Sequence, residues 1–287
     1  MFNIALRNIK IFFRNKASVF FSLLGVIIII LLYVLFLGDT LSSSYAELEG
    51  ARFLMDSWIM AGLISVSSIT TTMGAFEIMV NDKENKRLKD FYSAPLKKAT
   101  ILGGYLISAV VIGVIMSVLS LLIAEIYIIA YGGEILGILQ FLEVLGIIIL
   151  SVIASSSMVF LLVSFLKNVN AFSTASAILG TLVGFLTGIY IPIGILPVGV
   201  QWVIKLFPVS HSAVLLRQIM MKVPLNASFS GAEAGVLNSF KETMGINFKY
   251  GSTIMSPLEH ILFLILTIAV FYTLTVIKIS KKNRKGK

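Results

Sequence analysis

The residue types that carry most enzyme chemistry are scarce in this chain. Cysteine is absent, which excludes disulfides and thiolate metal sites, and the only two histidines, His211 and His260, lie too far apart in the sequence to form a ligand motif. No glycine-rich nucleotide-binding loop and no H-E-x-x-H motif occurs. The serine run 155–157 has no histidine near it, so we expect these serines to allow close helix packing or to bond backbone carbonyls. The pattern favours a chain without catalytic or metal-binding residues.

The strongest local pattern is a dense block of charge over residues 81–98, which separates two long apolar runs. Asn81 and Glu84 have the spacing of a capping box, and Pro95 would end a helix that starts there. The apolar residues of the block are spaced i, i+3, i+4, as on one stripe of a helix: Leu88, Phe91 and Tyr92. The block is therefore predicted to be a short amphipathic helix that contacts a partner. A solvated basic loop that only holds the topology is the alternative.

The composition places these patterns in a membrane protein. Apolar residues make up 57% of the 287 residues, charged ones make up 13%, and the mean hydropathy is +0.98. A water-soluble chain of this size cannot bury that much apolar surface. The net charge of +9 does not indicate nucleic acid as a partner, because the basic residues cluster beside the apolar runs, where lipid headgroups and membrane topology explain them.

We expect an all-α integral membrane protein whose residues 1–287 form a single transmembrane domain. Six apolar segments are long enough to cross a bilayer. They are residues 17–37, 57–80, 101–131, 137–166, 171–191 and 258–279. The first segment is too long for a signal-peptide core and lacks a small-x-small cleavage site, so it should be retained.

The first sixteen residues are predicted to form an amphipathic helix in the membrane interface, because apolar and basic side chains fall on opposite faces at 100° per residue. The apolar face consists of Phe2, Leu6, Ile9 and Phe13, and the basic face of Arg7, Lys10 and Arg14. Two further isoleucines, Ile4 and Ile11, do not follow this pattern.

Residues 192–221 are apolar, but Pro192, Pro197 and Pro208 divide them into pieces too short to cross the membrane. We expect two short helices that enter from one side and return. Residues 38–56 and 222–257 are predicted to be polar loops on the outer side. The alternative is a seventh span within 192–221.

The charge distribution separates these two topologies. With six spans and both termini cytoplasmic, 17 of the 23 lysines and arginines lie inside, whereas ten of the 14 acids lie outside. A seventh span would move six C-terminal cations to the outside. Six spans are therefore favoured, in a multi-pass protein of a plasma membrane, which we expect to be bacterial.

Charged residues within the predicted spans are sparse. Glu125 and Glu143 lie close to the outer turn, where we expect water to reach them, and no acid lies near mid-membrane as a proton-coupled carrier would require. Energy for any transport should then come from a partner chain. The fifth span carries a stripe of small residues every four positions, suited to close helix approach: Ser176, Gly180, Gly184 and Gly188. Either a neighbouring span or a second subunit could fill this stripe.

Two sequence patterns resemble the permease subunits of ABC-2 type ABC transporters. In the first, Asp82-Lys83-Glu84 is followed by Leu88 and then by Ala94-Pro95-Leu96, although Asn85-Lys86 stands where the family commonly has Gly-Thr. The second combines Gly188–Pro192 and Leu196-Pro197 with Trp202, Phe207-Pro208 and Leu216-Arg217, with Phe207 in place of the usual asparagine. Together with six spans and a basic N-terminal helix, the resemblance covers nearly the whole chain.

The resemblance implies a permease of an exporter for a drug, a peptide or a lipid-linked or similar amphipathic substrate. Its partners would be cytoplasmic ABC ATPase subunits, which would hold the ATP and magnesium while this chain holds no cofactor, and a second permease subunit, identical or not. The residues implied in ATPase coupling are Asn81, Asp82, Glu84, Arg87, Leu88, Phe91, Tyr92 and Pro95. Those implied in the re-entrant segment are Pro192, Pro197, Trp202, Pro208 and Arg217. An ion-coupled transporter and a non-transporting immunity or sensor protein are the alternatives.

Overall fold

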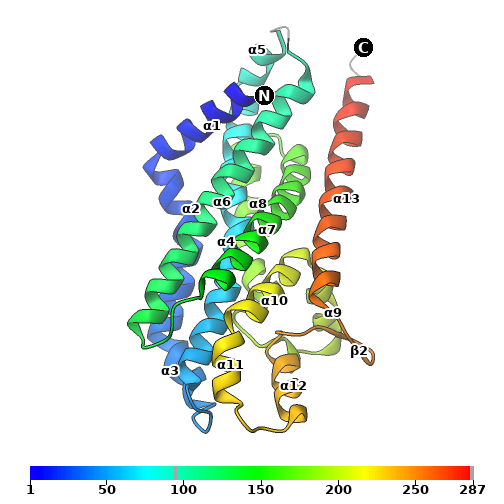
Figure 1. Cartoon of the computed structure of the whole chain (residues 1–287). Coiled ribbons are helices and arrows are strands. Elements are labelled where there is room, and N and C mark those ends of the chain that lie inside the picture. Colours follow the sequence, from blue (N-terminus) through cyan, green and yellow to red (C-terminus); the bar gives the residue numbers. More distant parts are fainter. Residues whose placement is uncertain (94–95, 285–287) are drawn as a thin grey trace.

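The computed structural model describes residues 1–93 and 96–284, and it is a bundle of long helices with almost no strand (Figure 1). Its helices are α1 (Phe2–Arg14), α2 (Lys16–Leu32), α3 (Gly38–Ser43), α4 (Ala51–Glu84), α5 (Arg87–Ser93), α6 (Lys98–Ala130), α7 (Ile138–Phe165), α8 (Val169–Leu186), α9 (Val198–Leu206), α10 (Pro208–Met220), α11 (Lys222–Ser228), α12 (Ala234–Thr243) and α13 (Pro257–Arg284). The remaining elements are a π-helical turn η1 (Tyr33–Leu37), a 3₁₀ turn η2 (Ile193–Ile195) and a hairpin of β1 (Lys249–Tyr250) and β2 (Thr253–Ile254).

The start of α1 and the end of α13 lie at the same end of the bundle as α5, and we call this the terminal end (Figure 1). Helices α3, α11 and α12 and the β-hairpin lie at the opposite end, which we call the distal end. This arrangement agrees with an even number of membrane crossings. The side of the membrane that each end faces stays a prediction from the charge distribution.

The described residues contain six helices, or continuous helical segments, that are long and apolar enough to cross a membrane. The six are Lys16–Ser43, Ala51–Glu84, Lys98–Ala130, Ile138–Phe165, Val169–Leu186 and Pro257–Lys278. The expected pair of short helices also forms, since α9 and α10 meet at Phe207-Pro208 with a bend of 89°. Whether this pair enters and leaves on one side stays a prediction.

The central helix of the bundle is α4, which is buried along most of its length and packs against α2, α6, α7, α8 and α10. Helices α2, α8 and α13 bury one side only and leave large apolar side chains exposed, as lipid-facing helices do. A movement of α4 would act directly on the five helices packed against it.

Serine hydroxyls join α4 to α6 and α7 within the core. Ser67 Oγ donates a hydrogen bond to Ser117 Oγ at 3.1 Å and accepts one from Ser120 Oγ at 3.0 Å. On the other side of α4, Ser151 Oγ donates to Ser68 Oγ at 2.7 Å, and Ser68 and Ser155 are 3.2 Å apart. The expectation that the serine run allows close packing is met at Ser155. Small hydroxyls let backbones approach and satisfy one another without water.

The polar loop expected over residues 38–56 is largely helical. The first span continues through η1 and α3 to Ser43, and α4 already begins at Ala51. The expectation failed because the polar residues of this stretch have partners in the protein. Asp56 is buried in α4, where Arg52 Nε lies 3.1 Å from both carboxylate oxygens and Tyr33 Oη donates to one of them at 2.8 Å.

The distal segment 222–257 is also more structured than a polar loop, since it contains α11, α12 and the hairpin. Its aromatic side chains explain this difference. Phe240 of α12 is buried, and its ring lies against those of Tyr45 and Phe229, with centroids 5.4 and 4.9 Å apart. A buried aromatic cluster of this kind holds α11 and α12 against the turn after α3.

Candidate functional site

Helix α1 packs across the start of α6 through a face that the sequence pattern did not reveal. Ile4, Asn8 and Phe12 are buried, and Asn8 Nδ2 donates a hydrogen bond to Ser108 Oγ at 3.2 Å. Gly104 makes this approach possible, because a Cβ atom there would lie 2.7 Å from Ile4 Cβ. The helix is therefore docked on the bundle.

The two faces predicted for α1 are placed as follows. The apolar side chains remain largely outside the protein core, Phe2 being 74% exposed, and are free to contact lipid. They are Phe2, Leu6, Ile9 and Phe13. On the basic face, Lys10 and Arg14 are exposed, whereas Arg7 turns toward the end of α4.

Arg7 binds a buried carboxylate at the end of α4. Its Nη1 and Nη2 donate to Asp82 Oδ2 and Oδ1 at 2.6 and 3.0 Å, and Tyr105 Oη of α6 donates to Oδ2 at 2.6 Å. Asp82 is 1% exposed, and Arg87 Nη1 of α5 lies 3.5 Å from its Oδ1. The hydrogen bond to Asp82 raises the pKa of the Arg7 guanidinium beyond its ordinary value, against the opposing effect of partial burial. One carboxylate thus joins α1, α4, α5 and α6.

The charged block 81–98 is divided differently from the sequence prediction. Asn81, Asp82 and Glu84 belong to the last turn of α4, so the predicted capping box at the start of the short helix is wrong. Glu84 Oε2 instead accepts a hydrogen bond from the backbone amide of Val169, the first residue of α8, at 3.0 Å. Lys83 Nζ donates to the carbonyl of Leu166. Helix α4 therefore continues into the charged block as far as Glu84, because the charged side chains of its last turn have partners on neighbouring elements.

The short helix itself is α5, and its apolar stripe already has contacts within the chain. Leu88 is buried in the main core, and Phe91 packs against that core with the Arg7 guanidinium 5.3 Å from its ring centroid. The side chain of Tyr92, and Pro95 altogether, lie outside the described residues. What α5 exposes is its polar side, with Arg87 59% exposed and Asp90 exposed. Contact with an ATPase stays a prediction.

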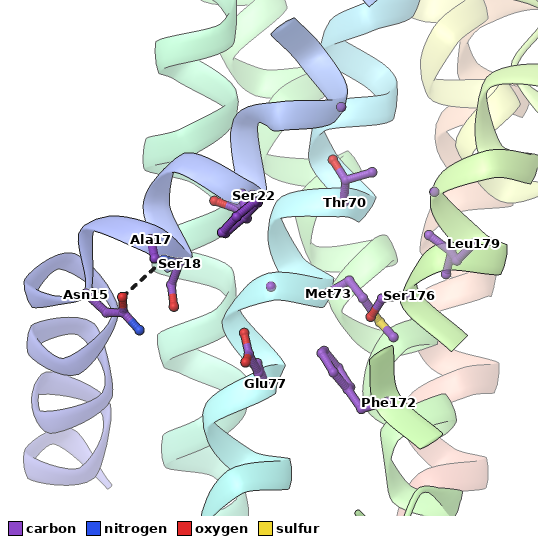
Figure 2. Close-up of a pocket in the computed structure, with 14 residues that line it drawn as sticks. Asn15, Ala17, Ser18, Ser22, Thr70, Met73, Glu77, Phe172, Ser176 and Leu179 are labelled. Carbon is purple, nitrogen blue, oxygen red and sulfur yellow. Dashed lines mark hydrogen bonds between the residues drawn. The ribbon is translucent and has the colours of Figure 1, made fainter. Parts of the chain in front are cut away.

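A groove of about 390 Å³ opens between α2, α4 and α8, the first, second and fifth spans (Figure 2). Asn15 and Ser18 lie at the start of α2, Met73 and Glu77 project from α4, and Ser176 projects from α8. Further lining residues are Ala17, Phe21, Ser22, Gly25, Thr70, Gly74, Phe172, Leu179 and Gly180. Glu77 is the one ionisable side chain among them.

The predicted small-residue stripe of the fifth span lies only partly on this groove. Ser176 Oγ is buried without a hydrogen-bond partner in the described part of the chain, and a Cβ atom at Gly180 would meet nothing within 4 Å. Gly184 is different, because the ring of Tyr190 from the same chain fills the space beside it. Gly188 lies beyond the end of α8 with a positive φ of 67°, so its predicted place in the stripe is wrong.

In the predicted re-entrant segment, Pro192 precedes η2, Pro197 caps α9 and Pro208 begins α10, so each proline lies at a helix boundary. Trp202 is 48% exposed on α9. Arg217 of α10 is fully buried, with Nη2 3.2 Å from the carbonyl of Gly188 and the guanidinium 4.8 Å from the ring centroid of Trp58. Arg217 therefore holds the loop after α8 against α4.

Sequence reasoning missed the polar cluster at the distal end. Arg52, besides binding Asp56, donates to Asp39 at 2.6 Å and to Tyr127 Oη at 2.8 Å. Glu125, which we expected to be wetted, is only 6% exposed, and its Oε2 accepts from the amide of Leu136. The i, i+4 spacing of Arg52 and Asp56 was the only local indication of this cluster.

The terminal end thus presents a helix fixed to the central span, and that span borders a groove shared with the first and fifth spans. The family described as ABC-2 family transporter protein matches residues 39–277, which is most of the chain. No curated protein shows a significant match. The groove, α4, α5 and the distal helices all lie within the matched residues except for the N-terminal part of the groove before residue 39. The chain belongs to the ABC-2 family of transporter membrane proteins, and it is a multi-pass membrane permease.

Proposed function

We propose that this chain is the permease subunit of an ATP-driven exporter, which pairs with a second permease subunit and binds ABC ATPase subunits at its terminal end. The observation that carries the proposal is the Asp82 junction. Because Asp82 binds Arg7 and Tyr105 and lies beside Arg87, a force on α5 acts on the end of α4 as well. Helix α4 borders the groove, so closure of the ATPases on ATP would change the groove.

The α2 and α8 side of the groove is the surface proposed to meet the second permease subunit. Large apolar side chains on it are exposed, including Phe21 and Leu182, while Gly180 leaves open space and Ser176 Oγ has no hydrogen-bond partner among the described residues. Small residues permit the backbone approach that stabilises helix pairs in lipid. Two copies of the groove facing each other would then enclose a path between the subunits.

The lining of the groove supports an amphipathic substrate. Met73 and Phe172 offer apolar contact, and Asn15 and Glu77 add polar groups (Figure 2). Phe21 adds a further apolar side chain to the lining. A neutral or cationic polar group on the substrate suits this lining, because Glu77 is its one ionisable side chain. A drug or peptide with an apolar body and a basic group is the substrate class that we propose.

The experiment is reconstitution of the chain with an ABC ATPase subunit that co-purifies with it, followed by measurement of vanadate-sensitive ATP hydrolysis and export of a cationic amphipathic dye in vesicles. Export that requires ATP and stops with vanadate supports the proposal. Export driven by a proton gradient without ATP would instead identify an ion-coupled carrier. Ligand binding without export would identify a sensor or immunity protein. Glu77→Gln should reduce export of the cationic dye, while Glu134→Gln, an exposed acid outside the groove, serves as the control.

A further inference from the structure

A second cavity, of about 960 Å³, lies at the distal end and shares no element with the groove. It is bordered by α7, α10, α11, α12 and the start of α13, together with the strand β2 (Figure 1). Its size suits a small amphiphile or part of a lipid. Nothing in the proposed transport path uses it.

The floor of this cavity is apolar and lies along the start of the fourth candidate span, Ile138–Phe165. Ile147 and Leu215 are buried there, and Leu150, Ile219 and Ile261 complete the floor. Along α7 the cavity extends from Glu143 to Leu150, which corresponds to about 10 Å of helix rise. Water on such a floor would find few hydrogen-bond partners, whereas a hydrocarbon chain would be accommodated.

The rim of the cavity is polar and carries more positive than negative charge. Lys222 and Lys241 lie on it with Glu143, and none of the three forms an ion pair within the described part of the chain. Gln218 Nε2 fixes one wall by donating to the carbonyl of Ile246 and to Asn247 Oδ1, at 3.0 and 3.1 Å. A cationic rim above an apolar floor is complementary to an amphiphile with an anionic head.

A glycine on α7 leaves room beside the cavity. Gly146 is exposed, lines the cavity between Glu143 and Ile147, and has nothing within 4 Å of the position of a Cβ atom. The exposed side of α7 here also carries Leu142 and Ile149, which suit contact with lipid. A hydrocarbon chain in the bilayer can therefore reach the floor past Gly146.

We propose that this cavity binds an anionic phospholipid from the distal leaflet, with the phosphate between Lys222 and Lys241 and an acyl chain on the floor beside Ile147. The site is independent of the proposed ATPase partners, because its residues belong to this chain alone. A lipid held there would join α7 and α13 to the distal helices α11 and α12.

The test uses the purified full-length chain and native mass spectrometry of bound lipid. Phosphatidylglycerol should bind about tenfold more tightly than phosphatidylcholine with the same acyl chains. Lys222→Gln and Lys241→Gln should each weaken phosphatidylglycerol binding about fivefold and phosphatidylcholine binding by less, because the choline cation already offsets the charge of its phosphate. Lys249→Gln is the matched control, since this distal lysine lies outside the cavity and pairs with Glu242 at 3.2 Å. Equal binding of the two lipids, or lysine variants that bind as the parent does, would overturn the proposal.

Further measurements test whether the cavity binds the acyl chain of the lipid or only its phosphate headgroup. Gly146→Leu should reduce binding of both lipids, with Gly235→Leu on α12 as the control because that glycine also has open space beside it but lies outside the cavity. Glycerol phosphate should not compete with phosphatidylglycerol. Competition at equal concentration would show that the site takes the free phosphate, which contradicts an acyl-chain site. Photoreactive acyl chains should label residues 143–150 and 257–261, and equal labelling of α2 and α8 would also contradict the site.

Discussion

Arg7 and Asp82 lie 75 residues apart in the sequence, and the guanidinium of Arg7 holds both carboxylate oxygens of Asp82 at 2.6 and 3.0 Å. The contact fixes the N-terminal helix to the end of the central span. Because Tyr105 donates to the same carboxylate, the start of α6 is held at the same point. Neither residue could be paired from the sequence, since the distance between them contains two spans.

The two partners of this ion pair should differ in their contribution to stability. Arg7 is 29% exposed and Asp82 only 1%, so removing the cation leaves a buried carboxylate without its main partner. Arg7→Met should cost about 3 kcal/mol, whereas Asp82→Asn should cost about 1 kcal/mol, because the amide still accepts from Tyr105 and Arg7 can turn to water. Thermal unfolding of the purified chain measures both. Lys10→Met, on the exposed side of α1, is the control, and equal losses for the two variants would contradict the asymmetry.

The exposed polar side of α5 should orient the ATPase. Asp90→Arg and Arg87→Glu are expected to weaken co-purification of the ATPase about fivefold at low salt, and less at high salt, because exposed charges act mainly on encounter and are screened. Lys167→Glu, in the turn between α7 and α8, is the matched control for a charge reversal at the terminal end. Unchanged co-purification with both α5 variants would show that the ATPase does not contact this side.

Leu88→Ala should have a different effect from the charge reversals at α5. Leu88 is 8% exposed and belongs to the main core, so its truncation removes packing within the chain and should lower stability by about 2–3 kcal/mol. A pull-down with this variant must therefore be read together with its melting temperature. Loss of the ATPase without loss of stability would show that Leu88 reaches the partner despite its burial.

Substitutions at two glycines of α8 should distinguish packing within the chain from contact between subunits. Gly180→Leu adds a side chain to open space, so it should leave the melting temperature unchanged but block dimer assembly or export. Gly184→Ala meets the Tyr190 ring of the same chain and should lower stability instead. Cross-linking in membranes and a melting curve measure the two effects. A Gly180→Leu variant that assembles and transports normally would place the second subunit elsewhere.

The orientation of the chain can be measured on a cysteine-free background, since the natural sequence has no cysteine. Cysteines at Ser43 and Ser239, exposed at the distal end, should react with an impermeant thiol reagent added outside the cell. Cysteines at Asn85 and Lys167, exposed at the terminal end, should react only after permeabilisation. Reaction of Asn85→Cys in intact cells would reverse the predicted orientation.

The spans could be predicted from the sequence within a few residues at most ends, because an uninterrupted apolar run has no stable alternative in lipid. Most ends that moved were those where charged residues have partners on other parts of the chain, whereas the fifth span ends early, at Leu186, just before Gly188 takes a positive φ of 67°. Helix α4 extends through Asp82 and Glu84 because Arg7 and the Val169 amide satisfy them, and such partners are invisible in a local pattern. Asn81 and Glu84 do have the spacing of a capping box, but they lie in the last turn of α4, where no helix begins.

The candidate site was only partly predictable for the same reason. The sequence located the apolar stripe of α5 but could not distinguish a partner's groove from the chain's own core, where Leu88 lies. The second face of α1 was missed because Asn8 interrupts its apolar pattern, although Asn8 finds Ser108 across the helix pair. Gly180 and Ser176 were found by their spacing, which is sufficient to identify a place of close approach but not the helix that comes there.

The π-helical turn Tyr33–Leu37 lies within the first span. A π turn contains one residue more than an α turn, so it rotates everything after it by about 100° relative to an unbroken α-helix. The half of the span before it presents Phe21 and Ser22 to the groove, while the half after it brings Gly38 beside the Arg52 guanidinium. The first span therefore consists of two helical segments whose faces are rotated relative to each other. Deleting a single residue from this turn would rotate the second half of the span by about 100° relative to the first, and so would turn other side chains toward Arg52 while leaving the groove side of the first half unchanged.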